Sequence, residues 1–145
     1  MAISKNATSW YGDNDEDLAT YLQQFRAGGY PVTRVRRLSC TLCGNATFLS
    51  LVDDDQGVAA VDCLECGART LVADSAEHLD DAQLEGCACP CGGETFTVSV
   101  GYAVTSDNEV RWISVGLRCL NDGALGVYTD WKIDYTPSAR LCPPS

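Results

Sequence analysis

Two pairs of cysteines have the type and spacing that a metal ion requires. Cys40-Thr-Leu-Cys43 is one C-x-x-C pair, and Cys63-Leu-Glu-Cys66 is the other. Each pair places two thiols on one tight turn, and four thiolates can surround one zinc ion as a tetrahedron. The sequence therefore predicts a structural zinc site whose ligands are Cys40, Cys43, Cys63 and Cys66.

A second group of cysteines is less regular. Cys87-Ala-Cys89-Pro-Cys91 offers C-x-C or C-x-x-x-C spacing, and Cys119-Leu-Asn-Asp122 ends in a carboxylate where a fourth thiolate would stand. Cys89, Cys91 and Cys119 would need one further ligand to hold zinc. Either Cys87 or Asp122 can supply it, and thiolate is the softer ligand, which favours Cys87. The alternative is a second unit without metal, held together by its aromatic side chains.

A β-hairpin is predicted between the two pairs of the first site. Residues 48–52 are a short apolar run, residues 53–57 have turn-forming Asp and Gly, and residues 58–61 are apolar again. Residues 69–74 would add a third strand. A short strand with three arginines, residues 32–38, leads into the first cysteine pair.

The second half of the chain repeats the first. Residues 43–48 read CGNATF and residues 91–96 read CGGETF, which agree at four of six positions. The spacing from Cys63 to Asp74 also equals the spacing from Cys119 to Asp130. A duplication explains both observations.

The repeated unit predicts strands of its own. Apolar and polar residues alternate over residues 96–104, a return strand covers residues 110–117, and residues 127–135 alternate again. The last of these strands, residues 127–135, would present one face to the core and the other to water.

One helix is predicted near the start of the chain. Asp13, Asn14 and Asp15 provide a cap and negative charge for its first turn, and Gly28-Gly29 ends it. Its apolar side chains recur at helical spacing, namely Leu18, Tyr21, Leu22 and Phe25. We expect this apolar stripe to cover the sheet of the first unit or the junction between the two units.

The unit around Cys40 and Cys66 resembles the zinc ribbons, and the whole chain resembles a tandem of two with a degenerate second ribbon. Cys89-Pro-Cys-Gly-Gly, Val110-Arg-Trp and Trp131-Lys-Ile-Asp-Tyr also resemble stretches of small actinobacterial proteins, a resemblance that implies no activity. The expected fold is mainly β, small and metal-stabilised, with two zinc-ribbon-like units of a hairpin and three strands plus one N-terminal α-helix. Zinc ribbons serve in transcription factors, ribosomal proteins, polymerase subunits and enzymes, so this resemblance implies a fold rather than a function.

The pattern divides the chain into five segments. They are an N-terminal tail and amphipathic helix packing on the body (1–31), a first zinc ribbon (32–74), an acidic linker (75–86), a second, degenerate zinc ribbon (87–136) and a Pro-rich tail (137–145). His78, in the linker, has no cysteine beside it, and we interpret it as a solvated residue. Cys142, in the tail, is interpreted as a spare thiol.

Charge limits the partners that the chain can bind. The formal net charge is -10, and residues 40–145 carry sixteen acidic but five basic side chains. Phosphate backbones repel such a surface, so direct nucleic-acid binding is not expected despite Arg34, Arg36 and Arg37. No stretch has an apolar run long enough for a signal peptide or a membrane span, which predicts a cytoplasmic location and no membrane partner. Thiols stay reduced in the cytoplasm.

These observations favour a non-enzymatic zinc-binding module for protein interaction or scaffolding. The sequence contains no recognisable pair of nucleophile and base, no Gly-rich phosphate loop and no histidine cluster. Two alternatives stay open. One is a transcription-associated or nucleic-acid-linked zinc-ribbon factor, and the other is a thiol and zinc redox switch or an open-zinc enzyme at the second site. The sequence gives neither the identity of the partner nor the oligomeric state.

Overall fold

The predicted mainly β fold with an N-terminal helix is confirmed. The computed structural model describes residues 4–6, 9–12, 15–24, 26–27, 30–40, 42–53, 55–89, 91–133, 135, 138 and 141. Its strands pair antiparallel in a ten-stranded sheet and a separate two-stranded one. Among these described residues, no helix is both long enough and apolar enough to cross a bilayer.

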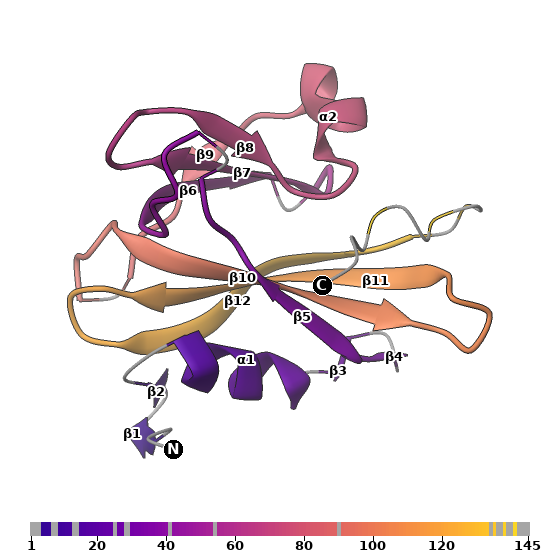
Figure 1. The fold of residues 1–145 in the computed structure, drawn as a ribbon, viewed down its shortest axis with the longest axis horizontal. Helices are drawn as coiled ribbons and strands as arrows, with labels where there is room; N and C mark the ends of the chain where they lie inside the picture. The colour runs from indigo at the N-terminus through magenta and orange to yellow at the C-terminus, as the bar shows by residue number, and fades with distance from the viewer. Residues whose placement is uncertain are drawn as a thin grey trace.

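Two units of three strands form the body of the sheet (Figure 1). The first unit consists of β6 (Phe48–Asp53), β7 (Val58–Cys63) and β8 (Arg69–Leu71). The second consists of β10 (Phe96–Val104), β11 (Val110–Cys119) and β12 (Ala124–Lys132). The remaining strands are β1 (Ser4–Asn6), β2 (Ser9–Tyr11), β3 (Arg26–Ala27), β4 (Tyr30–Pro31), β5 (Arg34–Arg37) and β9 (Glu85–Gly86).

The two units have the same register. Phe48 lies opposite Cys63 in the first unit, and Phe96 lies opposite Cys119 in the second. The units meet where β10 pairs with β6 through Phe96 and Phe48. The sheet turns at this point, so the first unit lies as a second layer over one face of β10–β12 (Figure 1).

Helix α1 (Asp15–Gln23) covers the other face of the second unit (Figure 1). Its Leu22 lies over two glycines, and a Cβ added to Gly116 would come within 2.9 Å of this side chain. A Cβ added to Gly101 would meet Val32 first, at 3.0 Å, and Leu22 at 3.7 Å. The helix therefore packs on β10 and β11 rather than on the first unit or the junction, because these glycines admit a close approach.

Strand β10 is consequently buried on both faces, although only one of its faces is consistently apolar. Phe96 and Val98 belong to a core cluster shared with Val61 of the first unit. On the opposite face, Thr97 and Ser99 are buried towards the helix layer. Small and polar side chains on that face therefore indicate close packing rather than exposure.

The segment with three arginines also pairs with the second unit. Strand β5 runs along β10, with Arg37 opposite Ser99 and Arg34 opposite Tyr102. Residues 38–40 then lead to the first cysteine pair.

The predicted linker has regular structure. It contains the short helix α2 (Ser75–His78), the 3-10 turn η1 (Leu79–Asp81) and β9, which pairs with β6. The two units share one core cluster. The division of the chain into five segments stays a prediction.

Candidate metal centres

The four thiols of the first pair of C-x-x-C turns come together in the structure. All four sulfur atoms lie within 4.8 Å of one another, and Cys40 Sγ is 3.5 Å from Cys66 Sγ. Cys43 Sγ is likewise 3.5 Å from Cys63 Sγ. These distances are far longer than a disulfide bond of about 2.05 Å. They are close to the edge of about 3.8 Å that a tetrahedron has when zinc and sulfur are about 2.3 Å apart.

A glycine closes each of these two turns. Gly44 has a φ of 79° and donates its N–H to the Cys40 carbonyl at 2.9 Å. Gly67 has a φ of 76° and donates to the Cys63 carbonyl at 2.9 Å. Residues with a Cβ rarely adopt such a positive φ, so the glycine after each pair lets the chain turn back around its two thiols.

The surrounding amides favour the thiolate form of the two buried cysteines. The Cys66 N–H, with help from the Asn45 side-chain amide, lowers the pKa of Cys63 to about 6 despite its burial. The Asn45 amide lies 3.5 Å from Cys63 Sγ. The Cys43 N–H similarly lowers the pKa of Cys40. The exposed pair shifts the other way, because contact with Cys63 raises the pKa of Cys43 to about 12 and contact with Cys40 raises the pKa of Cys66. Zinc binds the thiolate, so before metal binds only the buried pair favours the ligand form.

A second group gathers at the equivalent place in the second unit. Cys89, Cys91, Cys119 and Asp122 each offer one ligand atom, and these atoms lie within 4.8 Å of one another. Cys91 Sγ is 3.7 Å from Cys119 Sγ, and Cys89 Sγ is 3.5 Å from Asp122 Oδ1. In a tetrahedral zinc site with bonds of about 2.3 Å to sulfur and about 2.0 Å to oxygen, the sulfur and oxygen ligands lie about 3.5 Å apart. The second group therefore also fits a zinc ion.

Asp122 takes the place that Cys66 has in the first unit. Gly123, with a φ of 79°, donates to the Cys119 carbonyl at 2.9 Å, as Gly67 does to Cys63. The Ala124 N–H donates to Asp122 Oδ1 at 3.0 Å and fixes the carboxylate on this turn.

The structure does not bring Cys87 into this group. Its N–H donates to the Ser50 carbonyl at 2.8 Å, so the backbone of Cys87 follows strand β6. The thiol is half-buried, and this burial raises its pKa. Of the two candidates for a fourth ligand, the structure therefore groups Asp122 with the three cysteines. Cys142 lies outside the described residues.

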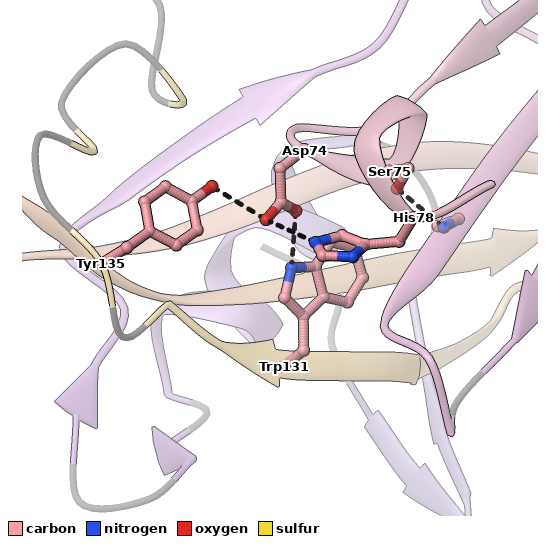
Figure 2. A network of polar contacts seen from close by, with 6 residues as sticks. Asp74, Ser75, His78, Trp131 and Tyr135 are labelled. Carbon is pink, nitrogen blue, oxygen red and sulfur yellow. Dashed lines mark hydrogen bonds and ion pairs between the residues drawn. The ribbon is translucent and has the colours of Figure 1, made fainter. Parts of the chain in front are cut away.

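A second polar arrangement, which we call the junction network, lies between the two units (Figure 2). Asp74 follows β8 in the first unit and is buried, with 3 % of its surface exposed. Its carboxylate accepts hydrogen bonds from Trp131 Nε1 at 3.1 Å and from the Tyr135 hydroxyl at 2.9 Å. His78 Nε2 lies 3.6 Å from the same carboxylate. Trp131 and Tyr135 of the second unit thus donate hydrogen bonds to the Asp74 carboxylate of the first unit.

This network was not predicted from the sequence. We interpreted His78 as a solvated linker residue, whereas the imidazole is half-exposed and faces a buried carboxylate. One signal was available in the repeat, because Asp74 aligns with Asp130. Asp130 accepts a hydrogen bond from Trp112 Nε1 at 3.0 Å, so both aligned aspartates bind an indole.

The chain matches no model of a known protein family, no curated protein and no solved structure. The resemblance to zinc ribbons therefore stays a prediction from the sequence, and the structure shows two groups of side chains that could hold a metal ion.

Proposed function

We propose that this protein is a non-enzymatic zinc-binding module. The arrangement of the first four thiols carries the proposal, with two contacts of 3.5 Å between sulfur atoms that are not disulfide-bonded. Four ionised thiols at such distances would repel one another strongly, and a divalent cation removes that repulsion. In this proposal Cys40, Cys43, Cys63 and Cys66 hold a structural zinc ion.

The second group would hold a second zinc ion through Cys89, Cys91, Cys119 and Asp122. Support comes from the equivalent turns of the two units and from the match of the sulfur–oxygen distance to a tetrahedral edge. Zinc at both places would tie together the two turns at the end of each hairpin.

Removal and return of zinc test this proposal. Protein stripped of metal with a strong chelator should melt at a lower temperature, and stoichiometric zinc should restore the melting temperature. Zinc at about 1,000 times its dissociation constant stabilises a folded state by about 4.1 kcal/mol. Magnesium is the matched control, because it prefers oxygen ligands and should restore nothing. Stripped protein that melts at the same temperature as the zinc-loaded protein would contradict the proposal.

The module would use the turns of its first metal site to bind another protein. Leu42 is 78 % exposed and Leu64 is 41 % exposed, and they lie between the two cysteines of each pair. The acidic charge of the surrounding chain suits a partner with a basic surface. We therefore propose a basic protein whose interface includes a small apolar contact for these leucines.

Affinity capture with paired variants tests the interaction. The double variant Leu42→Glu and Leu64→Glu keeps all four cysteines and should lose a basic partner that the wild-type protein retains. Leu49→Glu is the control, because this leucine is similarly exposed at 41 % but lies on β6 rather than between the cysteines of either pair. Equal recovery of the same basic protein by the wild type and the double variant would exclude this surface as the interface.

A further inference from the structure

We propose that the two metal centres exchange zinc at different rates, and that an incoming ligand enters the second centre at the coordination position held by Asp122. This inference rests on the proposed function, that both groups bind zinc. It assigns the first centre to lasting structural binding and the second to a zinc ion that can be taken up and given away.

The duplication provides an internal comparison, because solvent access is the same at both centres. Each has two buried and two exposed ligands in the same alternation along the chain. The buried ones are Cys40, Cys63, Cys89 and Cys119, and the exposed ones are Cys43, Cys66, Cys91 and Asp122. Each centre also supplies four ligands that are anionic when bound to zinc. Neither exposure nor charge therefore distinguishes the two centres.

What differs is the ligand atom at one position. Cys66 and Asp122 both precede a glycine of positive φ that bonds back to the preceding cysteine of its turn. Sulfur is the softer ligand and binds zinc more covalently than a carboxylate oxygen does. Asp122 Oδ1 is also engaged by the Ala124 N–H at 3.0 Å, which withdraws electron density from the carboxylate. The bond from zinc to Asp122 should be the weakest in either centre.

Hydrogen bonds to sulfur occur at both centres and therefore do not distinguish them, since the Asn45 side-chain amide lies 3.5 Å from Cys63 Sγ in the first. Exposed Cys91 accepts from the Gly93 N–H and from the Asn121 side-chain amide, both at 3.4 Å. Each such bond draws charge from the sulfur that would otherwise be donated to the metal.

Exchange then needs no change in the body of the protein. An incoming thiolate or nitrogen ligand forms a bond to zinc as the bond to Asp122 breaks. The carboxylate keeps its negative charge and its hydrogen bond from Ala124. Cys89, Cys91 and Cys119 would hold the ion during this step. When further incoming ligands replace these three bonds, the ion would leave with them and the freed thiolates would take up protons from water.

The test is the kinetics of zinc transfer from the full zinc-loaded chain to a coloured chelator, 4-(2-pyridylazo)resorcinol in excess. The wild-type protein should release one equivalent of zinc rapidly and one slowly, at rates that differ by at least about tenfold. Asp122→Cys should abolish the rapid phase. Cys66→Asp, the reciprocal exchange, should move the slow equivalent into a rapid phase.

Leu120→Cys is the matched control for an added thiol. It places a new cysteine on the same exposed turn but not at the ligand position, so the rapid phase should persist. Cys66→Asp keeps the inference testable if Asp122→Cys fails to fold.

Three results would overturn the inference. Two equivalents leaving the wild type at one rate would do so, and so would a rapid phase that survives Asp122→Cys. A single bound zinc that is lost in Cys66→Ser and kept in Cys119→Ser would overturn it as well, while leaving the proposed zinc at the first centre intact. Absence of zinc from both centres would refute the proposed function itself.

Discussion

Replacement of Tyr135 by phenylalanine removes one hydroxyl from the junction network and leaves the aromatic ring in place. The hydroxyl donates to Asp74 at 2.9 Å, and the receiving carboxylate is buried. A hydrogen bond to a charged group contributes about 1.5–3 kcal/mol to stability. Tyr135 is itself only half-buried, so water can partly replace the lost donor. We therefore expect Tyr135→Phe to lower the free energy of unfolding by an amount near the lower end of this range, about 1.5 kcal/mol.

Urea unfolding of the zinc-loaded protein measures this loss. With a slope of about 2 kcal/mol/M, a destabilisation of about 1.5 kcal/mol lowers the unfolding midpoint by about 0.75 M at an unchanged slope. Tyr30→Phe is the control. Its ring stacks on Trp112 with centroids 6.2 Å apart, and no hydrogen bond to its hydroxyl is found within the described part of the chain. Its effect should stay within about 0.5 kcal/mol.

A double-mutant cycle separates the hydrogen bond from other effects. If Tyr135 acts through Asp74, the variants Tyr135→Phe and Asp74→Asn should be non-additive by at least about 0.5 kcal/mol. An effect of Tyr135→Phe no larger than that of Tyr30→Phe would refute the idea that this network holds the two units together.

Two further predictions concern packing and acid stability. Gly116→Ala should destabilise the protein by about 1–3 kcal/mol because its Cβ would meet Leu22 at 2.9 Å. Gly86→Ala, which meets nothing within 4 Å, should leave the thermal midpoint nearly unchanged, and equal effects of the two variants would contradict this packing. The Gln83 N–H holds the pKa of Asp53 below its usual value. The stability from this contact should therefore be present above about pH 4 and be lost as pH falls through the lowered pKa. Carboxyl NMR titration gives that pKa, and a value at or above about 3.9 would contradict the contact.

The sequence predicted the features that depend on local spacing. The C-x-x-C pairs and the glycines that follow them define the first centre without knowledge of the fold. The repeat placed Phe48 and Phe96 at equivalent positions, and both lie opposite the next cysteine of their hairpins. These relations span a single hairpin, which is why the pattern was sufficient.

Features that depend on distant segments could not be predicted in this way. The alternating pattern of β10 could not reveal that a helix covers its small and polar face. Choosing between Cys87 and Asp122 required the pairing of β9 with β6, which directs the chain at Cys87 along the first unit. Trp131 and Tyr135 approach Asp74 only because the two units stack on each other.

Native mass spectrometry of protein purified without chelator tests the central claim most directly, because it counts zinc ions on each chain. We expect two zinc ions on the wild-type protein, with one lost in Cys66→Ser and the other lost in Cys119→Ser. A wild-type chain that carries no zinc, with its thiols reduced and its fold intact, would contradict the claim that these cysteines form metal centres.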